Sequence, residues 1–220
     1  MHKTIQNLID IQKKIELSLD TLKIDKVPKI IAVSKTFEMD KILPLIEHGH
    51  LDFGENKVQE AIDKWSDVKL NNNDIQLHLI GGLQTNKVKL AVKLFDYIHS
   101  VDTEKLAIKI SDEQKKQKKR IKIFIQVNIG NELQKSGIPF NEVDSFYTYC
   151  SKEKNMNIVG LMSIPPNDNN TETYFKSLSE LNYSLGLKEL SIGMSADYLK
   201  ALKYKSTFLR IGTSIFGKRD

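Results

Sequence analysis

Cysteine is almost absent from this chain of 220 residues, in which Cys150 is the single example. One thiol excludes an internal disulfide and makes a metal cluster built on thiolates implausible. Cys150 falls on a helical pattern with Phe146 and Tyr149, so we expect it to serve packing rather than chemistry.

Long apolar runs are missing as well. The sequence contains no stretch of about eighteen apolar residues, the length that a membrane-spanning helix needs. The first residues, from Met1 to Asn7, also lack the apolar core of a secretion signal. We therefore expect a cytosolic protein with no membrane partner.

Arginine is scarce, occurring only at Arg120, Arg210 and Arg219, although the net charge is +5. The basic run 115–120 could suggest a nucleic-acid partner. It closes an apolar-periodic helix, however, where cations favour the negative end of the helix dipole. No zinc-finger spacing, RNP-type aromatic strand or arginine-rich segment accompanies it. We therefore expect no nucleic-acid partner. Of the functions considered below, a nucleic-acid-binding barrel ranks last, after a carrier protein and an enzyme.

Short apolar runs alternate with helical patterns along the chain after an amphipathic leading helix at residues 1–22. The predicted strands cover 30–33, 51–56, 75–81, 97–101, 121–128, 158–163, 190–194 and 208–211. The predicted helices between them cover 39–48, 56–65, 84–94, 103–119, 139–153, 170–185 and a short segment through Leu199 and Leu202. Eight strands separated by helices are typical of a (β/α)8 TIM barrel, and 220 residues suffice for one such domain over 1–220.

An open doubly wound sheet is the alternative architecture. It would gather its ligand groups at one switch point, whereas a closed barrel collects them around one rim. Polar or small residues end strand after strand in this chain, which favours the barrel: Lys35, Asn56, Gly81, Ser100, Asn128, Ser163, Ser195 and Gly212.

Lys35 follows the first predicted strand and therefore lies at the end where such folds bind ligands. A lysine in that position is a candidate to form a Schiff base. The alternative is a solvated lysine that begins a loop, one of thirty in the chain.

The loops after the last two predicted strands contain small and hydroxyl residues. In barrels of this kind, phosphate is often held by these two loops, where backbone N–H groups approach an anion closely. Ser195 and Thr213 can donate hydrogen bonds there, and Gly212 lets the backbone come near. Alternatively, Ser195 or Asp197 caps the next helix and Gly212 serves a turn.

Arg210 lies two residues before Gly212, so strand alternation places both on one face. If that face is the barrel interior, the buried guanidinium needs an acceptor, such as an aromatic ring nitrogen or a carboxylate. An amine on the first strand, an anion site after the last two and an arginine between them describe a site for pyridoxal 5′-phosphate (PLP).

The chain resembles the pyridoxal-phosphate homeostasis protein family over nearly its whole length. The segments that carry the resemblance are 32–36, 53–60, 78–87, 99–102, 126–128, 135–137, 160–165, 190–197 and 210–217. The family has the barrel of fold-type III PLP enzymes, similar to the amino-terminal domain of alanine racemase. Two departures concern loops: Gly82 stands where the family usually has proline, and Lys205 begins a segment that is commonly Gly-Ser-Thr.

The resemblance implies roles for individual residues. Lys35 would carry the cofactor as a Schiff base, and Arg210 would face the pyridine nitrogen. The phosphate would be held by Ser195, Gly212 and Thr213. The cofactor site would be lined by Asn56 and Met194.

Further polar residues have open roles. His78 and His99 could be acid–base groups or hydrogen-bonded core residues. Glu55 could pair with a rim lysine, and Asp102 is expected to cap the helix that begins near Thr103.

A cationic guanidinium at the pyridine nitrogen disfavours its protonation, which argues against transamination but leaves racemisation open. Related racemases supply a second acid–base group from a carboxyl-terminal domain, whereas this chain has eight residues after Gly212. We therefore expect a non-enzymatic monomer that carries and buffers PLP in vitamin B6 and amino-acid homeostasis, with PLP-dependent apoenzymes as candidate recipients. A weak amino-acid racemase is the alternative.

Overall fold

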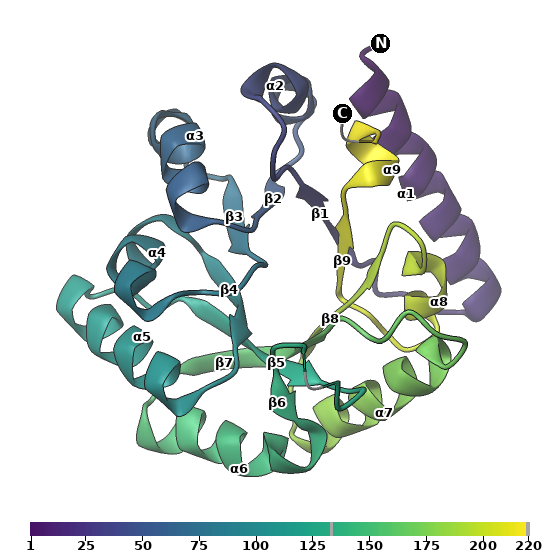
Figure 1. Cartoon of the computed structure of the whole chain (residues 1–220). Coiled ribbons are helices and arrows are strands. Elements are labelled where there is room, and N and C mark those ends of the chain that lie inside the picture. Colours follow the sequence, from purple (N-terminus) through teal and green to yellow (C-terminus); the bar gives the residue numbers. More distant parts are fainter. Residues whose placement is uncertain (133, 219–220) are drawn as a thin grey trace.

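The computed structural model describes residues 1–132 and 134–218. Within this part of the chain, eight parallel strands close into a barrel: β1 (Lys29–Val33), β2 (Asp52–Glu55), β3 (Gln76–Leu79), β4 (Tyr97–Val101), β5 (Lys122–Asn128), β7 (Asn157–Ser163), β8 (Glu189–Met194) and β9 (Phe208–Ile211). Neighbours in this series pair in parallel, and β9 pairs with β1 to complete the ring (Figure 1). The predicted (β/α)8 barrel is confirmed.

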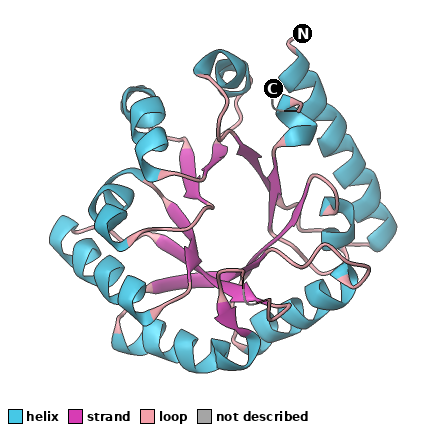
Figure 2. Cartoon of the chain, viewed as in Figure 1, coloured by secondary structure: helices cyan, strands magenta, loops and turns pink. Residues whose placement is uncertain are grey.

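Helices surround the barrel on the outside (Figure 2). They are α1 (Lys3–Leu22), α2 (Met39–Glu47), α3 (Val58–Asn71), α4 (Val88–Leu94), α5 (Glu104–Gln117), α6 (Val143–Thr148), α7 (Thr171–Ser184), α8 (Tyr198–Leu202) and α9 (Thr213–Phe216). No helix in the described ranges is long and apolar enough to cross a membrane.

The elements between β5 and β7 differ from the expected single helix over 139–153. A two-residue strand, β6 (Ile138–Pro139), pairs with β5 outside the closed ring. A 3-10 turn (Phe140–Glu142), α6 and a π-helical turn (Tyr149–Glu153) follow it. Sequence periodicity does not separate these helix types, because they differ by about one residue per turn or less. Cys150 is buried in the π turn, as the packing interpretation predicted.

The leading helix α1 packs beside the last elements of the chain (Figure 1). Its buried face consists of residues at three- and four-residue spacing, as predicted: Leu8, Ile11, Ile15 and Leu19. The Asn7 side-chain amide also donates a hydrogen bond of 2.8 Å to the carbonyl oxygen of Ile215 in α9. The predicted additional helix is therefore present, and it joins the start of the chain to the end of the barrel.

The apolar interior has two layers because alternate residues of each strand point to opposite faces. The larger layer lies between the strands and the helices. The smaller one, which we call the inner cluster, fills the barrel itself and consists of Ile31, Tyr97, Phe124, Met162 and Phe208. The barrel is thus a packed cylinder, and a ligand must bind at one of its mouths.

Candidate cofactor-binding site

The backbone on both sides of Lys35 is held by side chains. Lys35 is half-buried and lies two residues beyond β1, at the carboxyl-terminal mouth of the barrel. The carbonyl oxygen of the preceding Ser34 accepts a 3.0 Å hydrogen bond from Nζ of Lys64. The backbone N–H of the following Thr36, where φ is +66°, donates to Oε1 of Glu60 at 2.7 Å. The position of Lys35 is therefore fixed from two directions by α3.

Glu55 forms the centre of this support. It is fully buried, and its Oε1 accepts hydrogen bonds from the Ser34 hydroxyl at 2.7 Å, Lys64 Nζ at 3.1 Å and the Trp65 indole at 3.0 Å. The expectation that Glu55 pairs with a rim lysine is met by Lys64, whose side chain is 11% exposed. Within the described residues, Oε2 of Glu55 has no hydrogen-bond partner.

Asn56 follows β2 at the same mouth and is half-buried. The next loop packs directly against its backbone, since a Cβ on Gly81 would lie 2.4 Å from the carbonyl oxygen of Asn56. The Ser100 hydroxyl donates to the carbonyl oxygen of Gly81 at 2.7 Å. Three successive strands thus hold the segment that presents Asn56.

The loop after β8 is a tight turn. The backbone N–H of Met194 donates to Oδ1 of Asp197 at 2.6 Å, and the Asp197 N–H donates back to the Met194 carbonyl at 3.0 Å. Asp197 precedes α8, but its side chain makes no capping bond to that helix. The Ser195 hydroxyl instead accepts from the backbone N–H of Ser214 at 3.4 Å, so the loops after β8 and β9 meet.

The loop after β9 lies beside the end of β1. A Cβ on Gly212 would lie 3.3 Å from Cβ of Val33, two residues before Lys35. Gly212 is half-buried and Thr213 is exposed. The structure therefore brings the Lys35 segment and the Gly212–Thr213 segment to one mouth of the barrel, on neighbouring strands.

Arg210 is buried in the barrel interior, on the face that strand alternation predicted. Its NH1 donates to the carbonyl oxygen of Ser191 at 2.6 Å and to the Ser191 hydroxyl at 2.7 Å. Its NH2 donates to the carbonyl oxygen of Ser163 at 2.9 Å. None of these three bonds involves Nε. Burial lowers the pKa of Arg210 to about 10, a change that the charge of Asp197 opposes, so the guanidinium stays positive at neutral pH.

His78 and His99 are core residues with hydrogen-bonded rings, one of the two interpretations left open by the sequence. Both are fully buried, and Nδ1 of His78 lies 3.0 Å from Nε2 of His99. The other ring nitrogens contact Oδ1 of Asp52 and the Ser191 hydroxyl, each at 3.0 Å. Burial lowers the pKa of both histidines, although the bond to Asp52 opposes this effect at His78.

The prediction for Asp102 was wrong. Thr103 caps α5, with its hydroxyl accepting from the Leu106 N–H at 3.3 Å. Oδ2 of Asp102 accepts instead from the Gly137 N–H at 3.1 Å, and burial raises the pKa of this carboxyl group. The aspartate therefore ties together two loops that are distant in sequence, a contact that a capping pattern does not reveal.

The two departures from the family pattern differ in their consequences. Gly82 is exposed, and a Cβ there would meet no atom within 4 Å. Lys205 has φ of +58°, in the left-handed region that glycine adopts without strain. A glycine at this position, as the family resemblance implies, would adopt this backbone conformation without strain.

The sequence indicated no role for Lys64 or Ser191, and it marked Ser163 only as a polar residue at the end of a strand. Lys64 lies four residues after Glu60, and that spacing gave only a weak signal of a surface ion pair. Ser191 is the one polar side chain in the predicted strand 190–194 and lies between Leu190 and Ile192, a signal that the sequence does contain. Ser163 binds Arg210 through its carbonyl oxygen, a role that residue type does not indicate.

Comparisons with known proteins agree on the family. The sequence profile of the alanine racemase N-terminal domain matches residues 10–220. The pyridoxal phosphate homeostasis protein of Vibrio alginolyticus is 36% identical over 218 residues, which covers 93% of this chain and 94% of the relative. The Escherichia coli K12 protein of the same name is 33% identical and covers 100% and 98%.

Solved structures extend the comparison. PipY of Synechococcus elongatus PCC7942, determined with PLP bound, is 32% identical with a TM-score of 0.79, covering 92% of this chain and 100% of PipY. An alanine racemase of Clostridium difficile 630 is 14% identical with a TM-score of 0.70, covering 93% of this chain and 56% of the racemase, and shares the fold. The chain belongs to the pyridoxal phosphate homeostasis protein family, built on the alanine racemase N-terminal domain.

Proposed function

We propose that this protein binds PLP reversibly at the carboxyl-terminal mouth of its barrel and carries or buffers it in vitamin B6 and amino-acid homeostasis. Relatives at 33–36% identity bear the homeostasis name, and PipY has been determined with PLP bound. The observation that carries the proposal is the meeting of the Lys35 segment and the Gly212 loop at one mouth.

The residues of this mouth fit the chemistry of PLP. When bound, the cofactor supplies an aldehyde that condenses with amines and a ring that withdraws electrons. Lys35 supplies an amine for covalent attachment. Hydroxyl and backbone N–H groups suited to a phosphate come from Ser195, Gly212 and Thr213. The site is lined by Asn56 and Met194.

Arg210 would present a positive charge to the pyridine nitrogen. With its pKa lowered only to about 10, Arg210 remains a cation and opposes protonation of that nitrogen. A ring that stays unprotonated is a weak electron sink, which supports a carrier over a transaminase.

A weak amino-acid racemase is the competing function. Racemisation needs two acid–base groups on opposite sides of a substrate. His78 and His99 do not serve in this way, because both rings are fully buried and hydrogen-bonded within the barrel. This supports the carrier, for which we propose a single barrel domain over 1–220 acting as a cytosolic monomer and delivering PLP to recipient apoenzymes.

Borohydride reduction tests the attachment point. We expect reduction of the PLP-loaded protein, followed by peptide mass mapping, to give a pyridoxyl group on Lys35. Lys35→Ala should abolish this adduct and the visible absorbance, while Lys57→Ala, at an exposed lysine before α3, should retain both. A pyridoxyl group on another lysine, with Lys35 unlabelled, would overturn the proposed site.

Transfer and turnover separate the carrier from the racemase. The carrier should reactivate a PLP-dependent apoenzyme and should not exchange the α-proton of any amino acid with deuterium from solvent. Exchange that Lys35→Ala abolishes would instead establish the racemase.

A further inference from the structure

A line of polar side chains, buried except for half-buried Asp52 at one end, crosses the barrel interior from one mouth toward the other. We call it the interior chain, and its members, in spatial order, are Asp52, His78, His99, Ser191 and Arg210. The three links between its first four members measure 3.0 Å each, and NH1 of Arg210 lies 2.7 Å from the Ser191 hydroxyl. Each member comes from a different strand: β2, β3, β4, β8 and β9.

The two ends give the interior chain a direction. An arginine can only donate hydrogen bonds, and an ionised carboxylate can only accept them. The Ser191 hydroxyl accepts from Arg210, so its single proton is available for Nδ1 of His99. His99 then donates from Nε2 to Nδ1 of His78, and His78 donates from Nε2 to Asp52. In this arrangement both imidazoles are neutral, and each carries its proton on Nε2.

Burial works against ionisation of Asp52, but the hydrogen bond from His78 lowers the pKa of this carboxyl group, so Asp52 is ionised. With Asp52 ionised, the opposite direction would require a cationic imidazole inside the barrel. If Nδ1 of His99 donated to Ser191, its Nε2 would have to accept from His78. His78 would then carry protons on both nitrogens in order to reach Asp52 as well. Burial disfavours this cation, and burial lowers the pKa of both histidines. The neutral, one-directional arrangement is therefore favoured.

The aromatic surroundings keep the two imidazoles in place. The His78 ring stacks on Tyr97 with centroids 4.3 Å apart, and the His99 ring stacks on Phe124 at 4.2 Å. Phe208 lies against both imidazoles. Since these rings belong to or contact the inner cluster, a rotation of either imidazole would disturb the packing of the barrel interior.

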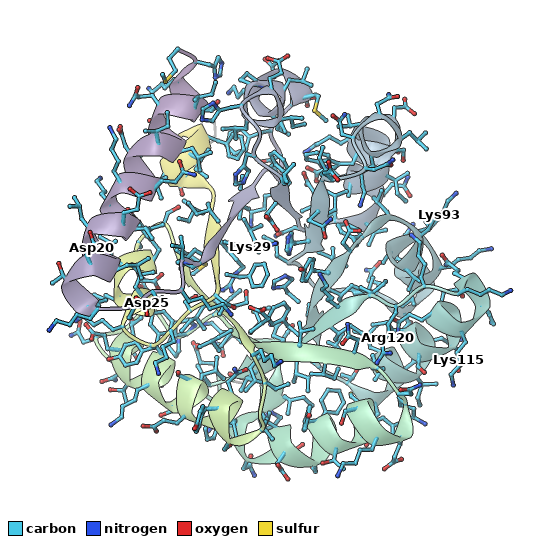
Figure 3. All side chains as sticks on the ribbon, turned by 180° about the vertical axis from the view of Figure 1, so that it is seen from behind. Asp20, Asp25, Lys29, Lys93, Lys115 and Arg120 are labelled. Carbon is cyan, nitrogen blue, oxygen red and sulfur yellow. The ribbon has the colours of Figure 1, made fainter. Side chains whose placement is uncertain are left out.

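The far end of the interior chain is anchored at the amino-terminal mouth. Asp52 begins β2, and its Oδ1 lies 3.6 Å from Nζ of Lys29, the first residue of β1. Figure 3 views the molecule from the side opposite to Figure 1 and labels Lys29 there. The support for Arg210 thus begins at the mouth remote from the proposed PLP site.

We propose that Ser191, His99 and His78 are positioning residues, which hold Arg210 in one orientation through a one-directional hydrogen-bond chain anchored at Asp52. This inference rests on the proposed function, in which Arg210 meets the pyridine nitrogen. A free arginine side chain has many rotamers, and fixing it before the ligand arrives removes an ordering cost from binding. The chain makes the guanidinium a preorganised part of the site.

Nitrogen-15 NMR of the PLP-free protein tests the direction. Long-range proton–nitrogen spectra at pH 7.5 should give both His78 and His99 as neutral rings with the proton on Nε2. A proton on Nδ1 of either ring, or a doubly protonated His78, would overturn the proposal. This result does not depend on the cofactor, so it is separable from the Lys35 labelling experiment.

Removal of one hydroxyl tests the positioning. We expect Ser191→Ala to weaken PLP affinity about 10-fold, because a hydrogen bond to a charged group is lost. The nitrogen-15 shift of His99 Nδ1 should also move toward that of a nitrogen with a free lone pair. Ser206→Ala is the matched control, since it removes another buried hydroxyl, which donates to the Ile192 carbonyl oxygen at 2.7 Å away from Arg210.

The two experiments distinguish failure of the positioning role from failure of the proposed function. If Ser191→Ala changes PLP affinity no more than Ser206→Ala, the positioning role is refuted while PLP binding stands. If wild-type protein shows the expected tautomers but Lys35 is never labelled, the proposed function fails, and the role of the interior chain toward PLP fails with it.

Discussion

Lys205 has a backbone conformation that normally belongs to glycine. Its φ is +58°, and its side chain is exposed in the turn before β9. A left-handed conformation costs a residue with a Cβ about 1–2 kcal/mol. Lys205 therefore carries local backbone strain in the turn that precedes β9.

We expect Lys205→Gly to raise the free energy of unfolding by about 1 kcal/mol, because it relieves this strain. Urea unfolding followed by circular dichroism measures the change. Lys200→Gly in α8 is the control, and it should lower stability by about 1 kcal/mol since that position is helical. A destabilising Lys205→Gly would show that Lys205 is not strained.

At the scale of elements, α3 holds the backbone segment that follows β1. Lys64 and Glu60 of this helix bond to the backbone of Ser34 and Thr36, on either side of Lys35. Lys64 also neutralises the buried Glu55. Removing one partner of a buried pair leaves the other charge uncompensated.

Lys64→Met should therefore lower the free energy of unfolding by about 3 kcal/mol. Denaturant unfolding measures it, and Lys176→Met is the matched control. Lys176 pairs with Glu180 on an exposed helix face, with both side chains about two-thirds exposed, so its loss should cost less than about 0.5 kcal/mol. Equal effects of the two substitutions would contradict a structural role for the Glu55 pair.

For the whole molecule, the buried histidines couple folding to pH. Burial lowers the pKa of His50, His78 and His99 below the ordinary value of 6.5. Below about pH 6.5, the unfolded chain therefore takes up protons that the folded barrel excludes. Because the unfolded state binds more protons, stability falls as the pH falls.

We expect the free energy of unfolding to be flat near pH 7.5 and to decrease below about pH 6.5. The slope has an upper limit of about 1.4 kcal/mol per pH unit for each histidine that stays neutral in the folded protein. Urea titrations between pH 7.5 and 5.5 measure it, in a range above most carboxylate titrations. Constant stability across this range would refute neutral buried imidazoles.

The basic run 115–120 lies at the end of α5 and continues to Arg120, two residues before β5 begins. α5 ends at Gln117, inside this run, as the helix-terminus interpretation predicted. Lys118 closes the helix in the left-handed conformation. Figure 3 labels Lys93, Lys115 and Arg120 on the same side of the molecule. The absence of a nucleic-acid partner stays a prediction, which salt-dependent binding assays would test.

The sequence by itself determined the alternation of strands and helices, the leading helix and the strand ends that carry Lys35 and Gly212, because periodicity and residue type are local properties. Only the tertiary structure decided the partners of Arg210, the bonds of His78 and His99, the role of Lys64 and the true contact of Asp102. These contacts depend on register and closure of the barrel, which join side chains far apart in the chain. Local sequence patterns do not indicate which residues far apart in the chain come into contact.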